Sequence, residues 1–211
     1  MHLSIRLLTM LWALTLFAPE AYALSPLTPH SQDVGHDQHC TVSSPNDGGY
    51  SVGRLSGSLL KANANTPLAP INKVWHISCD AETYLTFSTV DNRASSASTP
   101  GLGHYGLGQV NGSGKIGFYR VTMKNATVDG DPTRLFSTNS TAFNVVSSLT
   151  LTTTHRAIGW ANANNVQKSG RVFTAELEVL PTLASVAQMN GPITDRTLID
   201  GSMSLNFAFG I

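Results

Sequence analysis

The segment 101–121 contains residue types that phosphate-binding loops use. Gly101, Gly103 and Gly106 have the G-x-G-x-x-G spacing, and a Gly-Lys pair follows. A dinucleotide-binding turn needs a hydrophobic strand before the glycines and a helix after them. Here a polar, serine-rich stretch comes before the glycines, and more glycines follow where the helix would begin. The phosphate-loop pattern also fails, because Gln and Ile occupy the places of its first Gly and its Ser or Thr. We therefore predict a glycine-rich loop that leads into a strand at 115–124, and no cofactor.

Nucleophilic catalysis is the second chemistry that the sequence can be tested for. His76, His104 and His155 could each act as a base, but no serine has the G-x-S-x-G spacing of a nucleophile elbow. None of these histidines has a recognisable nucleophile nearby in the sequence. We interpret them as strand and loop residues and predict no catalytic residue, so that a secreted enzyme is the weaker hypothesis.

The residues with metal-ligand chemistry gather near the N-terminus: His30, Asp33, His36, Asp37 and His39. Imidazole and carboxylate groups suit zinc or copper. The surrounding residues 24–39 are polar, contain prolines and have no period, and the histidines lack helical H-x-x-x-H spacing. We therefore expect a flexible, solvated arm rather than a metal site.

The chain has two cysteines, Cys40 and Cys79. A catalytic thiol is one interpretation, since His39 precedes Cys40, but such a thiol needs a base and an electropositive setting. An even pair in an exported protein is instead typical of a disulfide. The predicted bond closes a loop of 79 − 40 = 39 residues, which the chain-entropy model values at about 4 kcal/mol.

Export is expected from the first residues. Arg6 precedes an apolar run at 7–17, and an Ala-Tyr-Ala cleavage site ends at Ala23. The run is too short to span a membrane, although a retained anchor is the alternative. We predict a signal peptide at 1–23, a flexible arm at 24–39 and one domain at 40–211, with no membrane insertion of the mature chain.

The charge composition limits the possible partners. Charged residues make up 12% of the chain and the formal net charge is zero, against about 25% charged residues in an average protein. Nucleic acids and anionic membranes bind clustered Lys and Arg, and here the few basic residues are scattered. We therefore expect neither as a partner.

Hydrophobic residues alternate with polar ones through most of the remaining chain. Period-2 runs between Gly, Asn, Asp and Pro clusters predict an all-β, antiparallel β-sandwich. The clear runs are 83–90, 115–124, 141–154 and 171–181; 50–60 and 73–79 are weaker, and 182–189 could form one helical turn.

The last strand alternates to the end of the sequence. Its apolar residues share one face: Met203, Leu205, Phe207, Phe209 and Ile211. One interpretation is an ordinary final strand that completes its own sandwich. The other is a strand with which an assembly partner pairs.

Several stretches together resemble one bacterial family. The marker residues are Asp91, Asn92, Arg93, Gly106, Gly108, Gly114 and Gly117. With the cysteine pair that brackets the first hairpin and the closing "LIDGSMSLNF", they resemble GltF-like periplasmic proteins. This family of unknown function is regarded as pilin-like and is linked to chaperone–usher fimbriae. The resemblance extends from about Cys40 to the C-terminus.

The resemblance implies an immunoglobulin-like (pilin-like) sandwich that lacks one strand. A periplasmic chaperone supplies that strand first, and the N-terminal extension of another pilin subunit replaces it at the outer-membrane usher. This is β-augmentation, in which main-chain hydrogen bonds and alternate side chains fill an open groove. The strand at 203–211 would pair with the chaperone. The expected location is the periplasm or a surface fimbria of a Gram-negative bacterium.

The arm departs from this pattern. A donor extension should alternate apolar residues, but Leu24, Leu27 and Val34 have the wrong spacing, and Pro26 and Pro29 interrupt them. Proline has no N–H for a β-ladder. We therefore expect a chain that accepts a strand and does not donate one, as in a tip subunit or a non-polymerising relative.

A function of another class stays open. The chain could be a self-contained periplasmic binding protein for a small ligand or a cell-envelope component, with Trp75, Trp160 and Tyr105 as contacts. A sandwich with a groove beside its last strand favours the assembly hypothesis, and a closed sandwich with a concave aromatic site favours the binding protein.

Overall fold

The computed structural model describes residues 39–52, 56–139, 143–162, 164, 166–194 and 197–210. Their regular elements are antiparallel strands and short 3-10 turns, which confirms the predicted all-β fold. The predicted signal peptide, Ile211 and the arm before His39 lie outside the described residues. Within the described part of the chain, no helix is long and apolar enough to cross a membrane.

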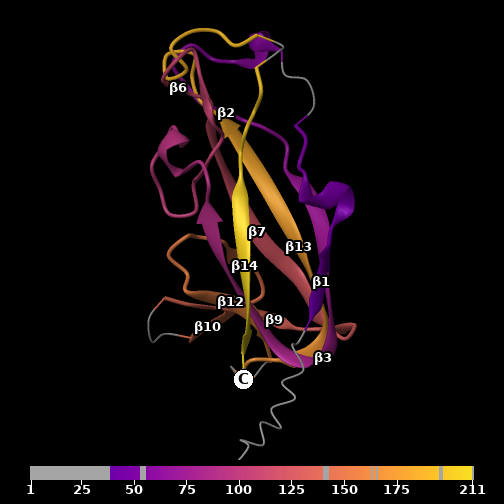
Figure 1. The fold of residues 1–211 in the computed structure, drawn as a ribbon. Coiled ribbons are helices and arrows are strands. Elements are labelled where there is room, and N and C mark those ends of the chain that lie inside the picture. Colours follow the sequence, from indigo (N-terminus) through magenta and orange to yellow (C-terminus); the bar gives the residue numbers. More distant parts are fainter. Residues whose placement is uncertain are drawn as a thin grey trace, which may run out of the picture. The chain divides into compact units, whose positions relative to one another are not determined.

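β3 (Ile71–Asp91) is the central strand of the fold and pairs along both edges. Its four antiparallel partners are β1 (Cys40–Ser43), β12 (Ala157–Ala161), β13 (Ser169–Leu183) and β14 (Met203–Gly210). β1 and most of β13 pair with its first half, and β12 and β14 pair with its second half. β3 bends between the halves, so that it contributes to two layers (Figure 1).

Each layer continues away from β3. In the first layer, β13 pairs with β7 (Gly117–Val128). In the second layer, β12 pairs with β9 (Arg134–Thr138), and β9 pairs in turn with β10 (Phe143–Val146). Short strands extend the first layer: β2 (Thr66–Pro67), β4 (Tyr105–Gly106), β8 (Asp131–Pro132) and β11 (Leu149–Thr150). β5 (Gln109–Val110) and β6 (Gly114–Lys115) form a separate hairpin.

Aromatic residues join the two layers in the core. Trp160 of β12 contacts Phe87 and Phe173, with ring centroids 6.2 Å and 5.1 Å away. The Trp160 ring is fully buried. Its one polar group, the indole N–H, donates to the Thr174 carbonyl at 3.0 Å and therefore has a hydrogen-bond partner inside the core. The alternation predicted for 171–181 is confirmed, because Phe173 faces this core while Glu176 faces outward.

Three predicted elements differ from the structure. The weak strand at 50–60 is wrong for the residues described there, because the Ser56 hydroxyl accepts the Ser58 N–H and starts a 3-10 turn at Gly57–Leu59. Residues 73–79 and 83–90 belong to a single strand, β3, since the extended backbone continues through the residues between them. The segment 141–154 contains two strands, because β10 pairs with β9 and β11 pairs with β7.

Within the predicted helical turn at 182–189, the structure has one hydrogen bond between residues four positions apart. The Met189 N–H donates to the Ser185 carbonyl at 3.1 Å, and a turn replaces a helix. The side chain of Met189 is fully buried, so this turn closes one end of the core.

Candidate functional site

A groove of about 620 Å³ lies beside the start of β14. We call it the β14 groove. One wall is formed by β14 and the residues before it, and the other by segment 47–52. The inner face of the first layer forms the floor, so the lining is mainly apolar and includes Ile71, Trp75, Val121, Val179, Met203 and Leu205.

β14 presents unpaired main-chain groups along this groove. The Asn92 N–H donates to the Ser202 carbonyl at 3.0 Å, and the register continues to Phe207 opposite Phe87. Because hydrogen-bonded and non-bonded pairs alternate in an antiparallel ladder, even-numbered residues bond to β3 and odd-numbered ones face the other edge. Among the described strands, only β3 pairs with β14. Within the part of the chain that the structure describes, that other edge is therefore open.

The predicted assembly residues combine this open edge with apolar side chains. Met203, Leu205 and Phe207 are half-buried against the core, and Phe209 is 43% exposed. Ile211, the fifth predicted residue, lies outside the described residues. Met203, Leu205 and Phe207 thus place their side chains against the core, while the N–H and C=O groups of the odd-numbered residues point away from β3.

Lys73 holds the opposite wall in place. Its ammonium group donates to the Pro45 carbonyl at 2.6 Å and also to the Gly49 carbonyl. Lys73 also lies over the ring of Tyr50, 5.1 Å from its centroid. These contacts fix segment 47–52 at the rim of the groove.

Tyr50 supplies the principal polar contact of this wall. Its hydroxyl accepts from the indole N–H of Trp75 at 3.0 Å and donates to the Leu177 carbonyl at 3.2 Å. Burial raises the pKa of Tyr50 above its ordinary value. A Cβ on Gly48 would lie 2.8 Å from the Trp75 ring, so glycine allows the backbone to lie against the indole.

A second pocket, of about 10 Å³, shares Trp75 and Leu205 with the β14 groove. We call it the narrow pocket. The ring of Phe207 lies 5.7 Å from that of Phe87, and Trp160 and Met123 close the pocket from behind. Met203 and Leu205 thus line the larger pocket, and Leu205 and Phe207 line the smaller one.

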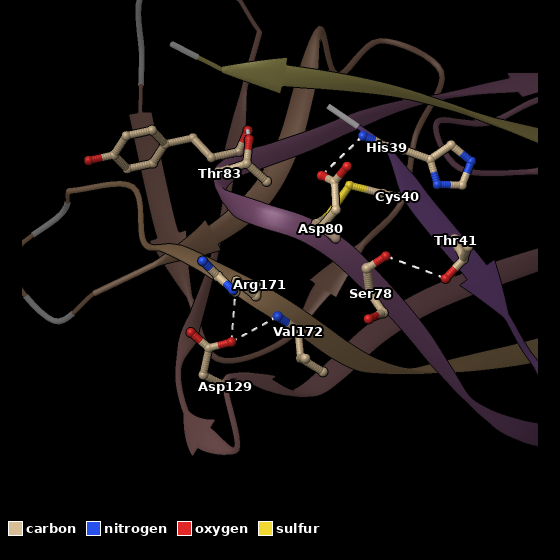
Figure 2. The surroundings of a disulfide bond; sticks show 11 residues. His39, Cys40, Thr41, Ser78, Asp80, Thr83, Asp129, Arg171 and Val172 are labelled. Carbon is tan, nitrogen blue, oxygen red and sulfur yellow. Dashed lines mark hydrogen bonds between the residues drawn. A yellow bond between two sulfur atoms is a disulfide. The ribbon is translucent and has the colours of Figure 1, made fainter. Parts of the chain in front are cut away.

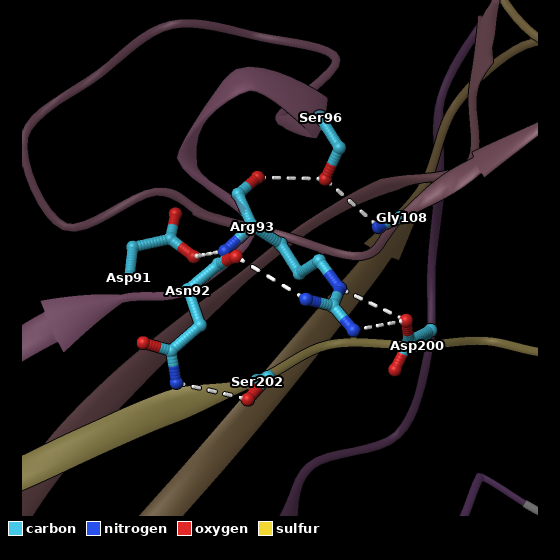
Figure 3. Close-up of polar contacts among 7 residues, drawn as sticks. All are labelled: Asp91, Asn92, Arg93, Ser96, Gly108, Asp200 and Ser202. Atoms are coloured by element: carbon cyan, nitrogen blue, oxygen red, sulfur yellow. Dashed lines mark hydrogen bonds and ion pairs between the residues drawn. The ribbon is translucent and has the colours of Figure 1, made fainter.

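The Asp91–Asn92–Arg93 marker anchors the start of β14 (Figure 3). The Arg93 guanidinium donates to one Asp200 carboxylate oxygen at 2.6 Å and 2.9 Å. The amide of Asn92 donates to the hydroxyls of Ser202 and Ser204, both at 3.0 Å. These contacts join two segments that are far apart in the sequence, so the marker positions one wall of the groove.

The marker glycines allow backbones to approach this anchor. The Asp91 carboxylate accepts the N–H groups of Arg93 and Gly106, and a Cβ on Gly106 would lie 2.1 Å from the Arg93 carbonyl oxygen. Gly108 donates to the Ser96 hydroxyl at 2.9 Å (Figure 3) and has a φ of +92°.

The other two marker glycines, Gly114 and Gly117, show the same close approach. Their added Cβ atoms would lie 2.0 Å and 2.2 Å from neighbouring carbonyl oxygens. The segment after the G-x-G-x-x-G continues as β5, β6 and β7, as the predicted loop and strand require.

Cys40 and Cys79 form the predicted disulfide, which fixes β1 beside the first half of β3 (Figure 2). The His39 N–H donates to the Asp80 carboxylate at 3.2 Å, and the Thr41 hydroxyl donates to the Ser78 carbonyl at 3.4 Å. The N-terminal end of the domain is thereby held at the edge of β3.

Two buried tyrosines lie behind the anchor. Burial raises the pKa of both Tyr105 and Tyr119, and the negative charge of Asp91 contributes in the same direction. The Tyr105 hydroxyl bonds to the Thr89 hydroxyl at 2.8 Å, and Thr89 also donates to the Thr152 carbonyl. Tyr119 lines the groove, whereas Tyr105 is almost fully buried.

The candidate bases lie on separate elements. His76 is on β3, His104 precedes β4 and stacks on Phe118 at 3.9 Å, and His155 lies in the turn after β11. In the described part of the chain, no three His, Cys, Asp or Glu residues lie close enough to hold a metal ion.

Sequence reasoning missed part of the groove. Tyr50 and the residues near Leu198 line the groove, and Asp200 anchors its β14 wall through Arg93. They were not predicted as site residues, although "LIDGSM" contributed to the family resemblance. Of the candidate ligand contacts, Trp75 lines the groove, Trp160 lines only the narrow pocket, and Tyr105 lines neither.

The chain matches no protein-family model, and no curated protein matches it.

Proposed function

We propose that this chain is a non-enzymatic, strand-accepting subunit of a chaperone–usher assembly. The β14 groove binds an extended segment from a periplasmic chaperone and later one from another pilin subunit. The acceptor role is favoured over the donor role, because the sequence before Cys40 lacks donor spacing.

The observation that carries the proposal is the open edge of β14 along an apolar groove. Unpaired N–H and C=O groups select an extended backbone, and alternate apolar side chains of the incoming strand fill the groove. An exposed strand edge is also an aggregation hazard unless a partner covers it. A chaperone strand satisfies both requirements.

The disulfide and the family resemblance support the proposed location. Disulfides persist in oxidising compartments, such as the bacterial periplasm. The marker residues that resemble GltF-like periplasmic proteins anchor β14, the strand that the proposal assigns to assembly. The subunit would act in the periplasm or in a surface fimbria of a Gram-negative bacterium.

The test is chaperone capture in the periplasm. Leu205→Asp places a carboxylate in the groove and is expected to abolish co-purification with a fimbrial chaperone while export continues. Asn206→Asp is the matched control, because Asn206 is exposed on the outward face of the same strand, and it should leave capture intact.

Two results together would overturn the proposal. They are a wild-type chain that stays monomeric without a chaperone, and the absence of a dodecyl-sulfate-resistant ladder when chaperone and usher are both present.

A small-ligand function is the second candidate. The groove volume of about 620 Å³ lies within the range of small-molecule pockets, and Trp75 and Tyr50 supply aromatic walls. This candidate predicts that an apolar probe such as 1-anilinonaphthalene-8-sulfonate binds at one saturable site. Binding that survives occupation of the groove by a strand would place the probe elsewhere.

A further inference from the structure

Tyr119 has a hydroxyl group that the described chain does not use. The residue belongs to β7, lines the β14 groove and is 6% exposed. Within the residues that the structure describes, its hydroxyl has no hydrogen-bond partner, whereas the hydroxyls of Tyr50 and Tyr105 are both bonded. A buried tyrosine hydroxyl normally has a partner. The hydroxyl of Tyr119 is therefore available to a bound molecule.

This hydroxyl is accessible from the groove. The described side-chain atoms that are both sealed from solvent and unpartnered belong to four other residues, Ser44, Ser98, His155 and Gln167. The hydroxyl oxygen of Tyr119 is not one of them, so it keeps accessible surface although the residue is nearly buried. Because Tyr119 lines the β14 groove, that surface belongs to the groove.

The ring of Tyr119 is held by two neighbours. It stacks on the ring of Tyr105, with the centroids 5.4 Å apart. A Cβ on Gly201 would lie 2.9 Å from the Tyr119 ring, so the backbone of Gly201 lies directly against it. A donor that is already fixed in place loses little side-chain entropy when a ligand binds.

The charges around the groove favour a neutral ligand. Its described lining contains one charged side chain, Asp47, and no Lys, Arg or His. The negative charge of Asp91 also acts on Tyr119, since it contributes to the raised pKa of that residue. The hydroxyl therefore stays protonated, and an anion would lose its hydration without gaining a cation. A ligand without an acceptor would leave the hydroxyl hydrogen unpaired.

We infer that the β14 groove binds a neutral, mainly apolar small molecule with one carbonyl-type acceptor, to which the Tyr119 hydroxyl donates. The inference rests on the small-ligand function, the second candidate proposed above. Ile71, Trp75 and Leu205 line the groove and contact the apolar body of the ligand, while the hydrogen bond from Tyr119 fixes its orientation.

The experiment compares three compounds that share a naphthalene body. 2-Acetylnaphthalene carries a carbonyl acceptor, 2-ethylnaphthalene has nearly the same shape without an acceptor, and 2-naphthoate carries a carboxylate. Equilibrium dialysis against the mature wild-type chain measures the affinity of each compound. The ketone and the ethyl compound should each bind at one saturable site, and 2-naphthoate should bind at least about tenfold more weakly than the ketone.

Tyr119→Phe tests the cause, since it removes the hydroxyl and keeps the ring. The affinity for the ketone relative to that for the ethyl compound should fall about fivefold, the effect of one neutral hydrogen bond. Tyr105→Phe is the matched control: the Tyr105 hydroxyl bonds to Thr89, and Tyr105 does not line the groove, so the wild-type ratio should persist. Tyr84→Phe, at an exposed position, replaces this control if Tyr105→Phe fails to fold.

The outcomes separate the inference from the function on which it rests. If the ratio is the same in Tyr119→Phe and the wild type, or if 2-naphthoate binds as well as the ketone, recognition by Tyr119 is wrong and small-ligand binding stands. If none of the three compounds binds the wild-type chain, the small-ligand function is overturned as well, and strand acceptance is tested separately by chaperone capture.

Discussion

Gly106 shows how a single residue controls the groove from outside it. The Cβ that any other residue would add lies 2.1 Å from the Arg93 carbonyl oxygen and 2.3 Å from the Ser96 hydroxyl. Arg93 in turn holds Asp200, which precedes β14. Loss of this close approach would move the anchor of β14.

Gly106→Ala is therefore expected to lower the free energy of unfolding by about 2–4 kcal/mol, because packed backbone cannot yield to the added methyl group. Gly57→Ala is the control: its Cβ would lie 3.4 Å from the nearest atom, an ordinary contact, and the change should cost under about 0.5 kcal/mol. Urea unfolding measures both. Equal losses in the two variants would contradict the role of Gly106.

The buried tyrosines make the molecule sensitive to alkali. The pKa of Tyr119 is raised above the ordinary value of 10.0 by burial and by the charge of Asp91. Above pH 10 the unfolded chain loses a proton that the folded chain retains, so the free energy of unfolding falls as pH rises. Each such tyrosine contributes a slope of up to about 1.4 kcal/mol per pH unit.

Tyr119→Phe should therefore flatten the loss of stability between about pH 10 and pH 12. Tyr84→Phe removes a tyrosine that is 37% exposed and serves as the matched control. Thermal unfolding at several pH values measures the slope. The explanation fails if both variants change the slope equally.

At the scale of elements, β3 is held by partners on both edges, and the disulfide secures one of them. β1 has only four residues and pairs with no other strand in the described part of the chain. The covalent link between Cys40 and Cys79 therefore maintains a pairing that a strand of this length would not hold strongly alone.

Reduction of the disulfide is expected to lower the free energy of unfolding by up to about 4 kcal/mol, mainly by freeing the unfolded chain. Urea unfolding with and without dithiothreitol measures this loss. A Cys40→Ser, Cys79→Ser double variant should show the same loss without reductant and no further response to it. A larger loss on reduction than in the variant would indicate an effect of reductant other than cleavage of this bond.

The sequence predicted elements better than the site. The alternation around Phe173 and Glu176 predicts β13 because one face of that strand is buried and the other is not. The groove was not predictable in the same way, since Trp75, Val121 and Leu205 meet only after three distant strands pair. The Arg93–Asp200 contact joins residues 107 positions apart, which no local pattern reveals.

The glycine segment was interpretable from chemistry alone. Its surroundings excluded a helix and favoured a loop, and the loop has a positive φ at Gly108 and a close backbone contact at Gly106. By contrast, 50–60 resembled a strand only weakly, because Tyr50 and Val52 alternate but the parity changes at Leu55. The Ser56 hydroxyl also competes for a backbone N–H and bends the chain.

At the scale of the whole molecule, zero net charge and an open strand edge act together. A net charge of one sign makes copies of a protein repel each other in solution, and the formal net charge of this chain is zero. The β14 edge, with Phe209 exposed near its end, is a template for pairing with another copy. Self-association is thus the expected fate of the domain when no partner strand is bound.

Phe209→Lys should reduce this association, since an inward-pointing charge protects an edge strand. Val172→Lys is the matched control, because Val172 is exposed to a similar extent, 39% against 43%, but lies on β13, which is paired on both sides. Sedimentation velocity over a range of concentrations measures the difference. Association that Val172→Lys reduces equally would not involve the β14 edge.

The pairing of β3 also determines the order of folding. Its partners come from both ends of the domain: Cys40 is 39 residues from Cys79, and the Thr86 hydroxyl bonds to Ala208, 122 residues away. Chains dominated by such non-local contacts fold in about milliseconds to seconds rather than microseconds. During synthesis, the second half of β3 must wait for the last residues. The time spent in that incomplete state, rather than final stability, is then the quantity on which the proposed chaperone would act.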